Sequence, residues 1–257
     1  MDFKVYTIKS MSTMVTLQFV DKRITEKIEY LDSLVVDIEK YLNEMEDKYS
    51  VFKEDSLVSQ HRKLGNEAVD IIMDEEYQEI YTLCLFYQKQ SEGLFNPFFD
   101  GAYNPTGLVK SYIIEKVFYK YLSPLVESGM IEAAAINCGG DMQVGVNQES
   151  DFTWNIGIEN PTLNGKLLAS YKIANGAVAT SGNNKRGNHI VSKEEKYSFK
   201  QVSVVGNKVS EVDVWATSLM AADTETAEDI IRKEKLTTIL IDINDEKIIY
   251  EEGEKIC

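Results

Sequence analysis

The order of helical and strand-like segments is the feature that most constrains the fold. Apolar residues recur every three or four positions along residues 28–45, 74–90 and 107–118, which predicts three helices in the first half of the chain. From residue 131 onward, short runs rich in Val, Ile and Thr alternate with Gly and Asn turn signals, which predicts strands. A run of helices followed by a run of strands indicates an α+β fold and argues against a doubly wound sheet.

Other segments complete this prediction. Residues 4–20 are expected to form two short strands or a hairpin, Pro124 to break the third helix or start a short turn, and residues 214–235 to form one late helix. The expected strands of the second half are 131–137, 141–146, 154–160, 166–173, 177–180, 189–192, 199–206, 237–243 and 247–252. No repeat or low-complexity linker interrupts the chain, so we expect a single domain over residues 1–257, with room for two lobes.

Charge and composition limit the classes of binding partner. The 257-residue chain has a formal net charge of −15, which disfavours nucleic acid and anionic membranes as general partners. An anionic substrate would need a local cation or a group of backbone N–H donors. The sequence shows no secretion signal and no apolar run long enough for a membrane span, so we expect a cytoplasmic protein. Cys84, Cys138 and Cys257 lack the spacing of a disulfide framework or zinc site, and the first two are expected to be small buried hydrophobes.

Residues 177–191, AVATSGNNKRGNHIV, concentrate groups that bind phosphate. Hydroxyls, backbone donors and cations fall within ten positions, and these are Thr180, Ser181, Gly182, Lys185, Arg186, Gly187 and His189. A solvated β-turn with ordinary surface charge is the alternative. The chain has only two histidines, and His189 lies beside this cluster.

Two shorter motifs are ambiguous. In DVWATSL, Asp213 and Thr217 are one helical turn apart, and their oxygens, with the Ala216 carbonyl, suit a hard cation such as Mg²⁺. Alternatively, Asp213 is an N-cap and Thr217 a surface hydroxyl. Gly139 and Gly140 permit close approach of the backbone to a ligand, but such a pair is more often a simple hairpin turn.

Eight motifs in order resemble the ApbE family of FAD:protein FMN transferases. The segments are SMSTMVTL, YSVFKEDSLVSQHRK, SEGLFNPFFDG, NPTGLVKSYIIEKV, INCGGDMQVG, WNIGIENP, AVATSGNNKRGNHIV and DVWATSL. The resemblance implies an α+β fold with antiparallel sheet and packed helices, binding FAD in a cleft. It also implies Mg²⁺-dependent cleavage of the FAD pyrophosphate and transfer of FMN to a threonine of an acceptor protein, with AMP leaving.

The resemblance also implies roles for single residues. Asp213, Thr217 and the carbonyls of Ala216 and Val109 match the metal-binding pattern, and His189 matches a histidine that assists transfer. Positions that line the flavin or its nucleotide correspond to Met11, Phe95, Asn96, Asn104, Lys110 and Ile190.

The chain departs from the family pattern at several of these positions. Ser12 replaces the usual Gly, Asn96 and Asn104 replace aspartates, and Arg62 falls where an aromatic or amide often faces the flavin. After His-Ile-Val the chain reads SKEEK instead of the usual Asp-Pro-x-Thr-Gly. Two alternatives therefore stay open, namely an FAD pyrophosphatase that releases FMN and AMP, and a non-catalytic FAD-binding protein.

Overall fold

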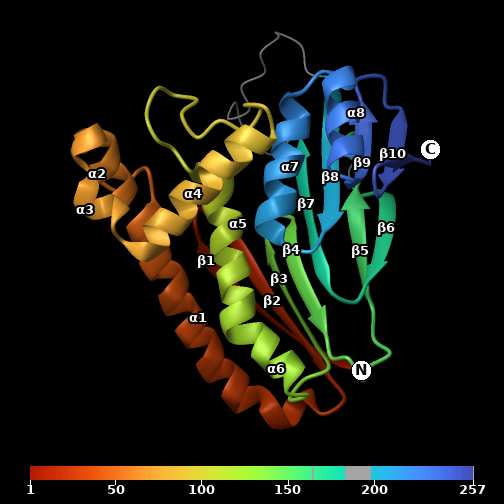
Figure 1. Cartoon of the computed structure of the whole chain (residues 1–257). Helices are drawn as coiled ribbons and strands as arrows, with labels where there is room; N and C mark the ends of the chain where they lie inside the picture. The colour runs from red at the N-terminus through yellow and green to blue at the C-terminus, as the bar shows by residue number, and fades with distance from the viewer. Residues whose placement is uncertain (164, 183–197, 257) are drawn as a thin grey trace.

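The computed structural model describes residues 1–163, 165–182 and 198–256, and it confirms an α+β fold with packed helices (Figure 1). The helices are α1 Ile28–Tyr49, α2 Leu57–Leu64, α3 Val69–Ile72, α4 Glu75–Gln90, α5 Thr106–Val117, α6 Ser123–Glu127, α7 Val209–Ala221 and α8 Thr224–Lys233. The short turns of helix are η1 Ile24–Lys27, η2 Gly65–Glu67 and the π-helical η3 Phe118–Leu122. The strands are β1 Asp2–Ser10, β2 Thr13–Asp21, β3 Ala133–Cys138, β4 Asp141–Val146, β5 Trp154–Glu159, β6 Leu167–Ile173, β7 Gly176–Gly182, β8 Phe199–Gly206, β9 Thr237–Asp242, β10 Lys247–Glu251 and β11 Glu254–Lys255.

Nine strands form one sheet in the order β1-β2-β3-β4-β7-β8-β9-β10-β11. Within the described residues, every neighbouring pair is antiparallel. The first hairpin, β1–β2, therefore lies beside β3, which comes from the second half of the chain, with Thr16 opposite Asn137. This pairing joins the N-terminal and C-terminal halves into one sheet.

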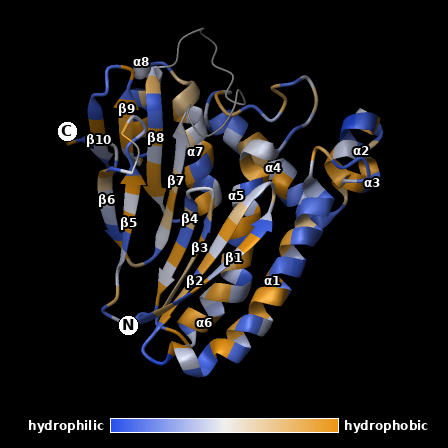
Figure 2. Ribbon diagram, turned by 180° about the vertical axis from the view of Figure 1, so that it is seen from behind, coloured by the Kyte–Doolittle hydropathy of each residue, from blue (hydrophilic) through white to orange (hydrophobic). Residues whose placement is uncertain are grey.

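The main helices cover one face of this sheet (Figure 1). Figure 2 shows the sheet from behind, with α1 alternating between apolar and polar residues along its length. Its apolar stripe is buried against the core and comprises Leu31, Ile38, Leu42, Met45 and Tyr49, which are spaced by seven, four, three and four residues. One buried apolar cluster runs from Ile8 in β1 to Tyr250 in β10.

The separate hairpin β5–β6 covers part of the other face. Trp154 and Ile156 of β5 pack with Val20, Val144 and Val178 of the large sheet in a second buried cluster. The alternating exposure along β5 follows from one face packing on the sheet while the other meets solvent.

The structure corrects the predicted helix at residues 214–235. Two helices occupy this region. The first, α7, begins at Val209, five residues before the predicted start, and ends at Ala221. The Asp223 side chain then caps α8 by accepting a hydrogen bond from the Thr226 N–H at 2.8 Å. The sequence prediction also missed the short helices α2, α3 and α6, although Pro124 does lie in the first turn of α6.

Several other predictions are confirmed. Residues 4–20 lie in the hairpin β1–β2, and the second-half strands fall within a few residues of their expected bounds, except that the expected strand 189–192 lies outside the described residues. Cys84 and Cys138 are fully buried, and burial raises the pKa of the Cys84 thiol to about 12. None of the described helices has both the length and the apolar character needed to cross a bilayer.

Candidate active site

Helix α7 carries the predicted metal ligands Asp213, Ala216 and Thr217. It begins earlier than predicted, so Asp213 lies inside the helix and not at its start. Asp213 is the fifth residue of the helix and 2% exposed, so it does not cap the helix, which rules out that alternative. Thr217 follows one turn later, and residues four apart project from the same helix face. Ala216 between them is fully buried, as is most of α7.

The end of β7 meets α7 through two hydroxyl groups. The Oγ atom of the fully buried Ser181 lies 3.1 Å from Oγ1 of Thr217, and either can donate the hydrogen bond. Next to it in β7, Thr180 Oγ1 lies 2.9 Å from Ser203 Oγ of β8. The stretch 180–182 is therefore the end of a sheet strand beside α7, whereas Lys185, Arg186, Gly187 and His189 of the same cluster lie outside the described residues.

Helix α5 reaches the same place with a cation. Lys110 Nζ contacts Asp141 Oδ2, and Asp141 Oδ1 accepts a hydrogen bond from the Thr180 N–H at 3.3 Å. The Asp141 side chain is fully buried and that of Lys110 is 22% exposed. Val109, the preceding residue of α5, is also buried, and α5 packs directly on α7.

The two glycines before Asp141 form a hairpin turn. Gly139 and Gly140 both have positive φ and connect β3 to β4, with Cys138 opposite Asp141. The turn alternative for this pair is confirmed. Because of this turn, Asp141 is the first residue of β4 and contacts both Lys110 and the Thr180 N–H. The sequence did not predict this role for Asp141.

Asn104 begins the segment that leads into α5. Its Oδ1 accepts hydrogen bonds from the N–H and the hydroxyl of Thr106, while its Nδ2 donates to Asp100 Oδ2 at 3.0 Å. Asp100 in turn pairs with Arg62 at 3.0 Å. Burial alone would raise the pKa of Asp100, but hydrogen bonds from Arg62, Asn104 and the Ala102 N–H lower it. Asp100 thus supplies a carboxylate beside the position where this chain has Asn104.

The remaining nucleotide-lining positions are more scattered. Phe95 is 4% exposed and lies under the first turn of α5, where a Cβ on Gly107 would come within 3.0 Å of its ring. Asn96 is exposed and accepts a hydrogen bond from the Phe98 N–H at 2.9 Å. Met11 is half-buried in the β1–β2 turn, and its N–H donates to Glu46 at 2.7 Å.

The described structure thus joins Lys110, Asp141 and Thr180 through direct contacts, and the next residue of β7, Ser181, contacts Thr217. Asp213, Ala216 and Val109 lie on the two helices that carry this group. Arg186, His189 and Ile190 lie outside the described residues, so their predicted roles stay predictions. Among the described residues, no group of three or more His, Cys, Asp or Glu side chains forms a metal cluster.

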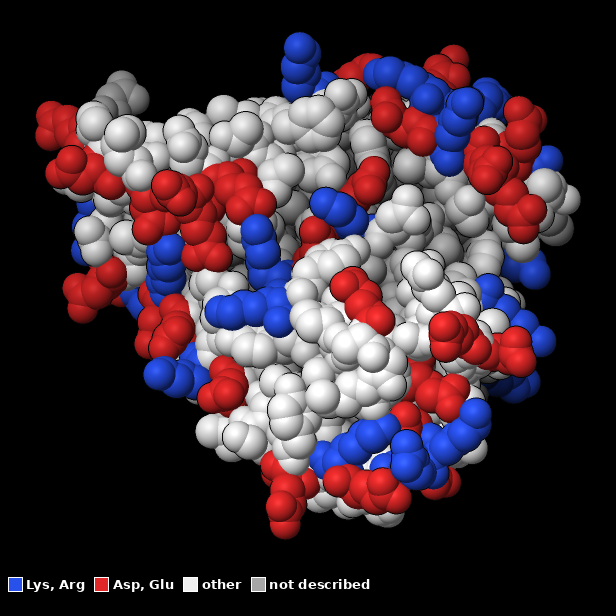
Figure 3. All heavy atoms as spheres, turned by 60° about the horizontal axis from the view of Figure 1, so that its bottom comes forward, with Lys and Arg blue, Asp and Glu red and all other residues white. Residues whose placement is uncertain are grey.

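A groove of about 610 Å³ lies elsewhere, at the opposite end of β4 and β7. Its lining includes Val146, Asn147 and Asn175, whose polar groups already bond to the protein: Asn147 Nδ2 donates to the Val126 carbonyl at 2.6 Å and Asn175 Oδ1 accepts from the Val146 N–H at 3.0 Å. On the face shown in Figure 3, basic side chains are interspersed with acidic ones. The groove lies away from the Lys110–Asp141 pair and from Ser181 and Thr217, so it is not part of the candidate site.

Comparison with known proteins agrees with this fold. A sequence model of the ApbE family matches residues 104–241, slightly more than half of the chain. The FAD:protein FMN transferase of Escherichia coli K12 is 26% identical over 135 residues, which cover 47% of this chain and 38% of that relative. The Salmonella typhimurium enzyme of the same name is 25% identical over the same shares. The chain therefore matches well under half the length of these curated relatives.

Solved structures extend the likeness to almost the whole chain. The flavin transferase ApbE from Vibrio cholerae superposes with a TM-score of 0.71 at 15% identity, covering 98% of this chain and 97% of that one. The ApbE protein from Thermotoga maritima gives a TM-score of 0.76 at 14% identity over the same shares. At such identities the superposition establishes the fold, and together with the sequence match over residues 104–241 it shows that the chain belongs to the ApbE family.

Proposed function

We propose that this chain is a Mg²⁺-dependent FAD:protein FMN transferase formed by a single domain over residues 1–257. The observation that carries the proposal is a set of contacts among α5, β4, β7 and α7 within the family-matched segment. Lys110 pairs with Asp141, which accepts a hydrogen bond from the Thr180 N–H, and the next residue of β7, Ser181, contacts Thr217. The names of the curated relatives support the same activity.

The residues on α5 and α7 fit a magnesium ion by their chemistry. The proposed ligands are the Asp213 carboxylate, the Thr217 hydroxyl and the carbonyls of Ala216 and Val109, and all of these donate oxygen, which Mg²⁺ prefers. Asp213 is 2% exposed in the second turn of a helix and has the hydroxyl of Thr217 one turn away. When bound, the ion would neutralise and polarise the pyrophosphate of FAD.

The protein's own side chains would hold the nucleotide around that point. Lys110 can place its ammonium group against phosphate oxygens, exchanging part of its contact with Asp141 for contact with the substrate. The resemblance assigns Met11, Phe95, Asn96, Asn104 and Ile190 to the lining of the flavin or its nucleotide. Thr180, Ser181, Gly182 and Arg186, from the hydroxyl-rich and basic run 177–191, are proposed to hold its phosphates. A positive group is needed there because the chain as a whole carries −15.

The proposed reaction transfers the FMN phosphoryl group. A new bond forms between the acceptor threonine oxygen and the FMN phosphorus, the pyrophosphate P–O bond breaks, and AMP takes the released electron pair. His189 is the proposed base that removes the hydroxyl proton. Such transfers depend mainly on positioning and charge stabilisation, for which a fixed helix pair is suited.

The test is to incubate the purified protein with FAD and Mg²⁺, with and without a threonine-containing flavinylation peptide, and to measure the peptide mass and free FMN and AMP. We expect the peptide to gain FMN. Asp213→Asn should abolish this transfer, whereas Asp229→Asn, which removes an exposed carboxylate of α8, should not change it. Peptide-independent release of FMN would identify a pyrophosphatase instead, and FAD binding without turnover would identify a binding protein.

A further inference from the structure

The N-terminus of α7 is held by side chains from two other elements. Its preceding residue, Lys208, supplies no side-chain cap. Instead, Glu115 Oε2 of α5 accepts hydrogen bonds from the Ser210 N–H at 3.1 Å and the Ser210 hydroxyl at 2.5 Å. Gln143 Oε1 of β4 accepts from the Val209 N–H at 2.9 Å. Free N–H groups at a helix start require such partners, and a carboxylate there also interacts favourably with the helix dipole.

Gln143 fixes α7 against the sheet. Its amide nitrogen donates to the Gly176 carbonyl at 3.0 Å and to the Asn207 carbonyl at 2.9 Å, so a side chain that is 2% exposed uses its oxygen and its nitrogen. Two glycines allow the close fit: a Cβ on Gly176 would lie 2.7 Å from the Gly206 carbonyl, and one on Gly206 would lie 2.8 Å from Val212. This side of the helix cannot shift without breaking these contacts.

Glu115 fixes α7 against α5. Ser210 lies three residues before Asp213, and Glu115 lies six residues after Val109, or about 9 Å along the α5 axis. The two helices pack side by side (Figure 1). The Glu115 side chain is 13% exposed, so its bonds to Ser210 are largely protected from water, whereas Lys208, at 3.9 Å and 60% exposed, adds little.

We propose that Glu115 is a positioning residue that sets the relative placement of α5 and α7, and through it the distance between the Val109 carbonyl and the Asp213 and Thr217 side chains. This inference rests on the proposed function, since it concerns the ligands of the proposed metal site. A metal site divided between two helices binds tightly only when the helices hold a fixed register, and groups outside the ligand set typically change metal affinity by about 10–100-fold.

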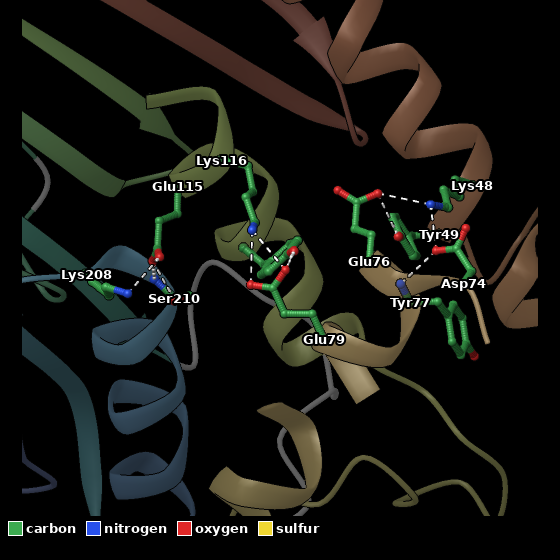
Figure 4. Close-up of polar contacts among 11 residues, drawn as sticks. Lys48, Tyr49, Asp74, Glu76, Tyr77, Glu79, Glu115, Lys116, Lys208 and Ser210 are labelled. Atoms are coloured by element: carbon green, nitrogen blue, oxygen red, sulfur yellow. Dashed lines mark hydrogen bonds and ion pairs between the residues drawn. The ribbon is translucent and has the colours of Figure 1, made fainter. Parts of the chain in front are cut away.

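A second contact of helix α5 offers a matched control. Glu79 of α4 also bonds to α5, accepting from the Tyr112 hydroxyl at 2.6 Å and pairing with Lys116 at 2.9 Å. Figure 4 shows both contacts, with Glu115 pointing toward Ser210 of α7 and Glu79 toward Lys116 of the same helix α5. Removing Glu79 breaks a bond between helices but touches no residue of α7.

The experiment measures Mn²⁺ binding to the full chain in the presence of FAD, from the electron paramagnetic resonance signal of free Mn²⁺. We expect Glu115→Ala to raise the dissociation constant by about tenfold or more. Glu115→Gln, which keeps an oxygen for the Ser210 N–H, should lie nearer to wild type, and Glu79→Ala should match wild type. Circular dichroism checks that each variant is folded.

The outcomes distinguish a failure of the positioning role of Glu115 from a failure of the proposed metal site. If Asp213→Asn weakens Mn²⁺ binding but Glu115→Ala does not differ from Glu79→Ala, the positioning role is wrong and the metal site stands. If Asp213→Asn binds Mn²⁺ as wild type does, the proposed metal site and the positioning role are both wrong. Should Glu115→Ala not fold, Ser210→Ala removes only the hydroxyl donor and is judged by the same comparison with Glu79→Ala.

Discussion

Ser181 at the end of β7 and Thr217 in α7 place their hydroxyl oxygens 3.1 Å apart, although the two residues are 36 positions apart in the sequence. Replacing Thr217 by Ala should lower FMN release by at least about tenfold, because it removes an oxygen from the proposed ligand set. Thr217→Ser keeps the hydroxyl and should retain most of the activity. The measurement is FMN release as a function of Mg²⁺ concentration, and equal Mg²⁺ dependence in both variants would contradict a ligand role for Thr217.

The Lys110–Asp141 pair should contribute to stability as well as to substrate binding. The Asp141 side chain is fully buried, so losing the Lys110 charge leaves its carboxylate less well compensated. In a double-mutant cycle with Lys110→Ala and Asp141→Asn, we expect a coupling free energy of about 1–3 kcal/mol from urea unfolding. Additive changes would show that the contact does not stabilise the fold. Lys110→Ala should in addition raise the KM for FAD.

Ser12 occupies a backbone conformation that favours glycine. Met11 and Ser12 form the two-residue turn of β1–β2 and have φ values of 51° and 59°. Such turns favour glycine, because a Cβ in the left-handed region costs about 1–2 kcal/mol. We expect Ser12→Gly to raise the free energy of unfolding by about 1 kcal/mol. As a control, Thr7→Gly in the exposed middle of β1 should lower it; a similar loss in both variants would contradict the explanation.

Asn104 is expected to be the better residue at its position in this chain, although the family pattern has Asp there. Asn104→Asp would replace the donor to Asp100 with a second carboxylate, which raises the pKa values of the pair and lowers stability by about 1–3 kcal/mol. The loss should shrink as the pH falls toward about 4, where carboxylates become protonated. The control is Asn96→Asp, because Asn96 is exposed and its acceptor oxygen would be kept. Thermal unfolding of wild type and both variants, at neutral pH and at about pH 4, tests this prediction.

His61 should make stability depend on pH just below neutrality. It is 8% exposed, its Nδ1 lies 2.7 Å from the Tyr77 hydroxyl, and burial lowers its pKa. The unfolded chain therefore binds a proton at higher pH than the folded protein. The stabilisation is full above the unfolded pKa of about 6.5 and is lost as the pH falls toward the folded pKa.

His61→Gln, which keeps a polar side chain near Tyr77, should remove this part of the pH dependence. The measurement is urea unfolding of both proteins at about pH 7.5 and about pH 5.5. We expect wild type to lose more stability than the variant between these two values. A parallel loss in both proteins would show that His61 does not titrate differently in the folded and unfolded states.

The fold could be predicted from sequence where periodicity alone decides the structure. The apolar stripe of α1 and the alternating runs of the second half placed most elements within a few residues. The prediction was wrong about where α7 begins, because the groups that cap it, Glu115 and Gln143, lie far away in the sequence. No local pattern marks such a start.

The candidate site was likewise only partly predictable from the sequence. The family motifs led to Lys110 and Thr217, and the hydroxyl-rich run 177–191 led to Ser181, which contacts Thr217 in the structure. They did not lead to Asp141 as the partner of Lys110, nor to Ser203 beside Thr180. Ser203 is a fully buried hydroxyl between Val202 and Val204, and that contrast with its two neighbours is the local signal that it has a partner.

The placement of β7 and α7 has a consequence during synthesis. Lys110 belongs to the first half of the chain, whereas Ser181 and Thr217 reach the growing polypeptide only in its second half. Because the ribosome delivers residues from the N-terminus at a limited rate, the early helices emerge well before the strand and helix that complete the junction. A nascent chain arrested before α7 would therefore carry Lys110 and Asp141 but lack Asp213, Ala216 and Thr217, three of the four proposed magnesium ligands, so it should not retain the nucleotide.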